Sequence, residues 1–347
     1  MKKINSLNII QPDDWHVHLR EGDMLNAVIK SSSRINHRCI VMPNLKKPVT
    51  TSKMGIEYKK KIFNLVSESS FLPLLPCYLT DNLDLVDFKN GLESNIFVGA
   101  KLYPENATTN SDFGISKIEK IFSALEILSE LSKPLLVHGE KISDDIDIFD
   151  REKAFIDSDL FEIREKFPNL KIVLEHVSSK YGADFVNQNN NISATITPQH
   201  MLLTKKDVFF NNTLNPYHLC MPVVKEETDL IALRKYACSG NSKFFLGTDS
   251  APHHVNKKKL NFESSPGIFS APCSIELYAS IFDEEDSMDK LEGFASINGP
   301  KFYNYPININ KVILERSEWF VPEFTIYNDM KVKNFMAGKK INWKVIK

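Results

Sequence analysis

Eight short apolar segments recur along the chain, and stretches with helical spacing separate most of them. The segments read as strands are 15–19, 38–43, 71–79, 97–103, 134–139, 171–177, 192–197 and 243–248. Apolar residues three or four apart in 54–66 and 115–131 indicate helices between them. Strands that alternate with helices and are apolar throughout indicate a parallel sheet covered on both faces. Eight such units predict an α/β protein with a closed (β/α)8, or TIM, barrel. An open doubly wound sheet is the alternative, but no Gly-x-Gly-x-x-Gly follows an early strand.

Length alone leaves the number of domains open. A chain of 347 residues suggests two average domains, yet barrels often run longer than that as one unit. The sequence contains no repeat or low-complexity linker. We therefore expect one domain over 1–347, with a long loop at 200–226 and a packed C-terminal extension at 298–347.

Charge and cysteine content narrow the class of partner and the compartment. Lys and Arg total 43 against 44 Asp and Glu, which gives no electrostatic reason to expect nucleic acid or an anionic membrane as a partner. No segment approaches the ~20 apolar residues of a membrane span, and no apolar run follows the first residues as in a secretory signal. The cysteines are odd in number and widely spaced, which predicts reduced thiols in a cytoplasmic protein; they are Cys39, Cys77, Cys220, Cys238 and Cys273.

The first predicted strand carries two histidines. In 15–20, Trp15, Val17 and Leu19 alternate with His16, His18 and Arg20. Because residues two apart in a strand point the same way, both imidazoles and Arg20 should share one face and the apolar residues the other. Two imidazoles on a rigid strand suit one metal ion, and Arg20 could reach an anionic substrate beside it. A half-exposed strand with chance histidines is the other interpretation.

Other predicted strands end on polar residues at the same mouth of the barrel, where active sites of this fold lie. They are Lys101, His138, His176 and Asp249. Lys101 has apolar neighbours, and an unpaired ammonium is costly to bury. Either it reaches to water from the strand end, or its neutral amine carries CO2 as a carbamate. A carbamate and Asp249 would supply the negative charge that two divalent cations need, and this set of ligands suits Zn2+.

These residues and their surroundings resemble the amidohydrolase superfamily and, more closely, the dihydroorotases of the single-domain bacterial type. The matching motifs span most of 11–272; they are 14–20, 41–44, 101–104, 106–110, 138–140, 147–152, 175–176, 197–200 and 247–253.

The resemblance implies a binuclear zinc enzyme of pyrimidine biosynthesis, acting as a homodimer. His16, His18 and Asp249 would hold one zinc and His138 and His176 the other, with carbamylated Lys101 (N6-carboxylysine) as the bridge. Asp249 would take the proton of the attacking hydroxide and give it to the leaving ring nitrogen of L-dihydroorotate. The reverse reaction would close N-carbamoyl-L-aspartate into dihydroorotate.

The resemblance also implies a substrate site. Arg20, Asn44 and His253 would hold the free carboxylate of the substrate, and 106–110 would be a mobile lid. The further contacts implied are His18, His138, Met221, Pro266 and, from the lid, Thr108 and Thr109. Two positions depart from the family, since leucine is usual at Met221 and alanine at Pro266. Proline lacks an N–H group, so only a carbonyl contact could persist there.

Two other functions remain open from the sequence. One is a different cyclic-amide hydrolase, similar to dihydropyrimidinase or allantoinase, although Arg20 and Asn44 favour a substrate with a free carboxylate. The other is a metal-free barrel that serves as a scaffold. The remaining histidines, His37, His200, His218 and His254, are not expected to be metal ligands.

Overall fold

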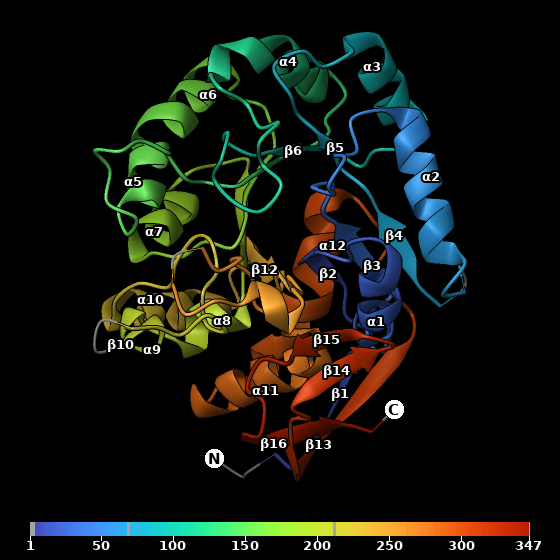
Figure 1. Ribbon diagram of the computed structural model, residues 1–347, viewed down its shortest axis with the longest axis vertical. Coiled ribbons are helices and arrows are strands. Elements are labelled where there is room, and N and C mark those ends of the chain that lie inside the picture. The colour runs from blue at the N-terminus through green and yellow to red at the C-terminus, as the bar shows by residue number, and fades with distance from the viewer. Residues whose placement is uncertain (1–3, 68–69, 211–212, 262, 347) are drawn as a thin grey trace.

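The computed structural model describes residues 4–67, 70–210, 213–261 and 263–346, and it confirms the α/β barrel (Figure 1). The barrel strands are β2 (Asp14–Val17), β3 (Arg38–Val41), β4 (Leu72–Leu74), β5 (Cys77–Tyr78), β6 (Ala100–Leu102), β7 (Leu135–Val137), β8 (Ile172–Leu174), β9 (Ile192–Ile196) and β12 (Phe244–Leu246). Parallel pairing runs through β2, β3 and β4 and then from β5 through β6, β7, β8 and β9 to β12.

The ring of strands is interrupted at two places, between β4 and β5 and between β12 and β2. At the first, the predicted single strand 71–79 is wrong, because the chain is divided into β4 and β5 around Pro76, which has no N–H group for a ladder. Between β12 and β2, the Asp249 N–H donates to the carbonyl of His16 at 2.9 Å and the His18 N–H to that of Ser250 at 3.0 Å. These bonds join the last strand to the first at the end where the polar residues lie.

Helices surround the strands on the outside. They are α1 (Gly22–Ser33), α2 (Ser52–Phe63), α3 (Leu85–Glu93), α4 (Phe122–Glu130), α5 (Arg151–Phe155), α6 (Phe161–Lys166), α7 (Lys180–Gln188), α10 (Glu227–Cys238) and α11 (Ser274–Glu284). Figure 1 shows α2 to α7 as an arc around the barrel. The helix predicted at 54–66 is α2, whereas that predicted at 115–131 begins only with a 3-10 turn at Ile118–Ile121 before α4.

Side chains fill the barrel interior at the N-terminal ends of the strands. Trp15, Leu136, Val173 and Phe245 belong to one buried cluster there. Helix α12 (Asn298–Tyr303) covers this end, and the Tyr303 ring stacks on Trp15 with centroids 4.4 Å apart and an angle of 8° between the rings. Helix α12 and these side chains therefore close the N-terminal end of the barrel, and the polar residues lie at the opposite, C-terminal end of the strands.

Strand β2 departs from the simple alternation predicted for it. His16 and His18 do share one side, but the pairing with β3 shifts register between Asp14 and Val17. As a result Trp15 packs in the inner cluster, while Val17 and Leu19 join the main core outside the barrel. The prediction that all three apolar residues face one way is wrong, because a bulge reverses the direction of side chains.

Two segments outside the barrel contain more structure than predicted. The expected loop 200–226 includes the end of α8 (Pro198–Leu202), α9 (Lys205–Val208), and a hairpin of β10 (Phe209–Phe210) and β11 (Thr213–Leu214). Near the C-terminus, β13 (Lys311–Phe320), β14 (Phe324–Tyr327), β15 (Met330–Lys333) and β16 (Lys340–Val345) form antiparallel pairs. An unpredicted first strand, β1 (Ser6–Ile10), pairs with β13. Across the described residues, no helix is long and apolar enough to cross a membrane.

Candidate metal centre and active site

The two histidines of the first barrel strand meet at its C-terminal end. Their Nε2 atoms are 3.3 Å apart, and both side chains are buried. Asp249, which follows β12, brings Oδ1 to 3.3 Å from His16 Nε2 and 3.1 Å from His18 Nε2. The two strands lie side by side at the barrel seam, so residues more than 230 positions apart in the chain form one group of possible metal ligands.

Three further residues complete a buried cluster. The ring of His176 lies 5.0 Å from that of His16 and 4.8 Å from that of His138, between centroids. Lys101 on β6 is fully buried, and its Nζ lies 4.8 Å from the centroid of the Tyr103 ring. The structure thus brings together all the residues that the sequence analysis selected as metal ligands.

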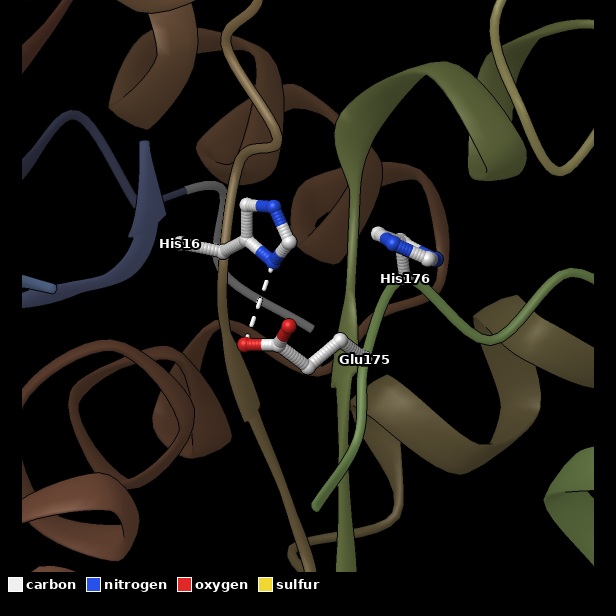
Figure 2. A group of neighbouring side chains, drawn as sticks. All are labelled: His16, Glu175 and His176. Atoms are coloured by element: carbon white, nitrogen blue, oxygen red, sulfur yellow. Dashed lines mark ion pairs between the residues drawn. The ribbon is translucent and has the colours of Figure 1, made fainter. Parts of the chain in front are cut away.

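Two carboxylates that the sequence analysis left without a role support this cluster. Glu175 has one oxygen 3.2 Å from His16 Nδ1, and its other oxygen contacts the Lys101 amine. Figure 2 shows Glu175 below the rings of His16 and His176, with the contact to His16 as a dashed line. Glu140 lies 2.7 Å from His138 Nε2. An acceptor such as Glu140 fixes the orientation of a metal-binding imidazole.

Asn44 plays the same part for His18, since its Oδ1 lies 2.9 Å from His18 Nδ1. Glu140 and Glu175 stood in motifs that the sequence displays, each within two residues of a selected histidine. For Glu140 that spacing was the available signal, because a strand-end histidine needs a partner for its second nitrogen. Glu175 instead contacts His16, which is distant in the sequence, so local spacing does not reveal its partner.

Burial sets the charge of the cluster. Desolvation holds the pKa values of His16, His18 and His176 well below the usual range, which leaves the imidazoles neutral. Burial likewise lowers the pKa of the Lys101 amine well below its ordinary value. For Asp249, burial raises the pKa to about 7 against the opposing effect of His138, Lys101 and Arg20.

These residues fit divalent metal ions. Neutral imidazole nitrogens and a carboxylate are ligands that Zn2+ prefers. His176 Nδ1 and Glu140 Oε1 are buried and have no hydrogen-bond partner in the described chain. Buried polar atoms normally have partners, so these unpaired atoms beside the imidazoles indicate a place for metal ions.

The backbone is strained at this end of the barrel. Arg20, His176 and Asp249 have φ values of 60°, 42° and 45°. These values lie in the left-handed region, which residues other than glycine rarely adopt. Each such residue costs of order 1–3 kcal/mol, and these conformations cluster at functional sites. Here the turns direct three side chains into one cavity instead of letting the strands continue.

The residues expected to contact substrate surround the cluster. A small cavity of about 20 Å³ is lined by His16, His18, Arg20, Asn44, Tyr103, Thr108, Thr109, His138, His176, Met221, Asp249, Ala251, Pro266 and Gly267. His253 lies beside it, with Nε2 3.3 Å from an Arg20 Nη and 2.8 Å from the Pro266 carbonyl. Pro266 therefore uses its carbonyl, as its missing N–H requires.

The segment 106–110 lies across this cavity. Asn44 Nδ2 donates to the Thr109 carbonyl at 2.9 Å, and Asn110 Nδ2 donates to the Asn44 carbonyl at 2.9 Å. The Thr109 hydroxyl is 3.5 Å from the Pro266 carbonyl. Thr108 and Thr109 thus form part of the wall of the small cavity.

The other histidines have structural partners. His200 pairs Nδ1 with the Thr197 hydroxyl at 2.7 Å and Nε2 with the Pro222 carbonyl at 3.0 Å, so both of its nitrogens are engaged. His254 Nε2 lies 3.1 Å from the Asp329 carbonyl, and His218 Nδ1 lies 3.0 Å from Asn215. His37 is half-buried at the end of a loop.

A barrel whose strand ends carry this buried histidine, lysine and aspartate cluster is the arrangement of the amidohydrolases, and the model of the amidohydrolase family matches residues 9–312. A dihydroorotase of Hahella chejuensis is 45% identical over 343 residues, which are 98% of this chain and 99% of that protein. The chain belongs to the dihydroorotase family of the amidohydrolases.

Solved structures agree with this assignment. A dihydroorotase from Saccharomyces cerevisiae, in complex with 5-fluoroorotic acid, matches with a TM-score of 0.91 at 31% identity. A dihydroorotase from Campylobacter jejuni matches with a TM-score of 0.90 at 32% identity. In both cases the match covers 99% of this chain and 98% of the other.

Proposed function

We propose that this protein catalyses the reversible closure of N-carbamoyl-L-aspartate to L-dihydroorotate in pyrimidine biosynthesis. The observation that carries the proposal is one cavity in which Arg20 and Asn44 adjoin the buried histidine and aspartate cluster. Both compounds carry a free carboxylate that takes no part in ring closure. A guanidinium can bind that carboxylate by a planar two-point contact, with Asn44 and His253 as further partners.

The proposed metal ligands are His16, His18 and Asp249 for one zinc ion and His138 and His176 for the other, with carbamylated Lys101 between them. Bound there, the ions would polarise the amide carbonyl and lower the pKa of water. The contacts of Glu175, Glu140 and Asn44 to three of the imidazoles leave one nitrogen of each ring for this purpose.

Lys101 is suited to carbamate formation. A neutral amine adds to CO2 and releases a proton, and burial favours the neutral form. The carbamate keeps one N–H group on the Lys101 nitrogen. Glu175 contacts this nitrogen and could accept a hydrogen bond from it. The carbamate oxygens would then be free for the metal ions.

Asp249 is proposed to carry the proton between the reacting atoms. In ring closure the ureido nitrogen attacks the side-chain carboxyl carbon, and Asp249 takes the proton of that nitrogen and returns it to the departing oxygen. One more proton comes from water, because two carboxylates become one. The carboxylate lines the cavity beside His16 and His18, where it can take up a proton from one reacting atom and return it to another.

The test is an assay of purified, zinc-loaded protein with N-carbamoyl-L-aspartate, L-dihydroorotate and dihydrouracil, together with its metal content. We expect turnover of the first two in opposite directions and weak or no turnover of dihydrouracil, which lacks the carboxylate. Preference for dihydrouracil would favour a dihydropyrimidinase-like enzyme instead. A protein that binds no metal and turns over none of the three would contradict the proposal and favour a scaffold.

We further propose that residues 1–347 act as one domain, in the cytoplasm, as a homodimer. Pairing of β1 with β13 supports the single domain, since it joins the two ends of the chain in one sheet. Buried free thiols at Cys39, Cys77, Cys220 and Cys273 suit a reducing compartment. Light scattering of the purified protein would test the dimer, and a monomer mass would contradict it.

A further inference from the structure

Three consecutive carbonyl groups beside the cavity, those of Ser265, Pro266 and Gly267, all accept from side chains. The Pro266 carbonyl accepts from His253 at 2.8 Å and from the Thr109 hydroxyl at 3.5 Å. The carbonyls on either side accept from a single donor, the Lys258 amine, at 2.9 Å for Ser265 and at shorter range for Gly267. The Lys258 amine thus binds the carbonyl groups on both sides of Pro266, the residue that contacts His253.

The two N–H groups of this tripeptide are also bound. Ser265 donates to the Lys257 carbonyl at 3.0 Å, and Gly267 donates to the Leu219 carbonyl at 2.8 Å. Pro266 has no N–H group. Every backbone polar group from 265 to 267 is therefore satisfied, and Lys258 is the donor to two of the three carbonyl groups.

Lys258 has no other evident purpose in the described chain. None of the described carboxylates lies within ion-pair distance of its amine. Burial lowers the pKa of this amine to about 7, so holding it there is unfavourable without the carbonyl dipoles. Its neighbour Lys259 differs, because its exposed side chain forms an ion pair with Glu263 at 2.7 Å.

We propose that Lys258 is a positioning residue for the substrate carboxylate: it clamps the carbonyls of Ser265 and Gly267, and so holds Pro266 where it orients His253 and meets the lid residue Thr109. The inference rests on the proposed function, in which His253 and Arg20 bind that carboxylate.

The test compares three variants of the full-length, zinc-loaded protein. Lys258→Met removes the donor but keeps the length of the side chain, Lys258→Arg keeps two donors, and Lys259→Met is the matched control. For each we would measure kcat and KM for N-carbamoyl-L-aspartate, zinc content, and amide hydrogen exchange in 263–269. Exchange reports on the clamp without requiring turnover.

For Lys258→Met we expect KM to rise by about tenfold, as for loss of one charge-assisted contact, with kcat within about threefold and zinc content unchanged. Exchange at Gly267 and Ile268 should become faster in the same variant. Lys258→Arg should largely restore KM, and Lys259→Met should match the parent protein.

Unchanged KM or unchanged exchange in Lys258→Met would overturn the inference, as would equal losses in Lys259→Met. Loss of zinc together with kcat would also overturn it, because that pattern means general collapse of the site. If the parent protein itself turns over neither carbamoyl-aspartate nor dihydroorotate, the proposed function fails. The exchange data would then decide the clamp separately.

Discussion

At the scale of single residues, Asp249 combines two duties that a substitution can separate from each other only in part. It lies 3.1 Å from His18 Nε2 as a possible metal ligand, and its carboxyl is the proposed proton carrier. Asp249→Asn keeps an oxygen but cannot take a proton. We expect kcat to fall by more than the ~10²–10⁴ usual for loss of a general acid–base group, in both reaction directions. Zinc analysis of the variant is the control, and near-normal turnover would remove Asp249 from the mechanism.

Arg20 gives a prediction about substrate affinity. Its backbone carbonyl accepts from Tyr58 at 2.8 Å, and its guanidinium reaches the Pro252 carbonyl at 3.4 Å, so the side chain is held over the cavity. Arg20→Ala should raise KM for N-carbamoyl-L-aspartate at least tenfold, at about 1.4 kcal/mol per decade. Arg34→Ala is a matched control, because Arg34 pairs with Glu276 on α11 instead. A lower kcat at unchanged KM would mean that Arg20 does not bind substrate.

Lys101 gives the prediction that separates a carbamate-bridged centre from an ordinary zinc site. Lys101→Ala should be almost inactive and bind zinc poorly, and a short carboxylic acid such as acetate should restore part of the activity by occupying the vacated space. Lys101→Arg should not help, because a guanidinium stays charged and does not form a carbamate. Mass spectrometry of gently handled, zinc-loaded protein should find one CO2 on Lys101. Active protein with two zinc ions and an unmodified lysine would contradict the bridge.

At the scale of elements, periodicity predicts the barrel but not its local irregularities. Alternation in 15–20 correctly directs His16 and His18 to one side, yet it misplaces Trp15, because a bulge depends on the pairing with β3 and not on composition. The contacts of Glu175 also could not be predicted from periodicity. They join β8 to β6 and β2, strands 74 and more residues apart, so no local pattern contains them.

Helix α12 provides a prediction at this scale. A Cβ atom on Gly299 would lie 1.9 Å from the Nε1 atom of Trp15, and Tyr303 stacks on the same indole. Trp15 is buried among the inner barrel residues and has little room to shift. Gly299→Ala should therefore lower the free energy of unfolding by about 1–3 kcal/mol, as overpacking does. Chemical denaturation would measure this, and an unchanged value would mean that the barrel floor adjusts freely.

At the scale of the whole molecule, the sequence indicated a packed C-terminal segment but not what it packs against. Residues 6–10 pair with 311–315, so the two ends of the chain share a sheet outside the barrel. This pairing joins residues about 300 positions apart, so the local sequence of one strand gives no indication of its partner. The active site lies at the strand ends of the barrel, which suggests that the outer sheet serves stability and not the chemistry.

Trp343 on β16 tests that division. Its side chain is 0% exposed, its Nε1 donates to Asp283 at 3.3 Å, and the Arg316 guanidinium lies 4.8 Å from its ring, so it attaches β16 to α11. Trp343→Ala should cost about 3–5 kcal/mol of unfolding free energy, while Phe320→Ala on neighbouring β13, where the side chain is 67% exposed, should change it by less than about 0.5 kcal/mol. Because neither residue reaches the cavity, kcat and KM per folded, zinc-loaded molecule should stay at the parent values in both variants. A fall in kcat for folded Trp343→Ala would show instead that the outer sheet helps to set the geometry of the active site.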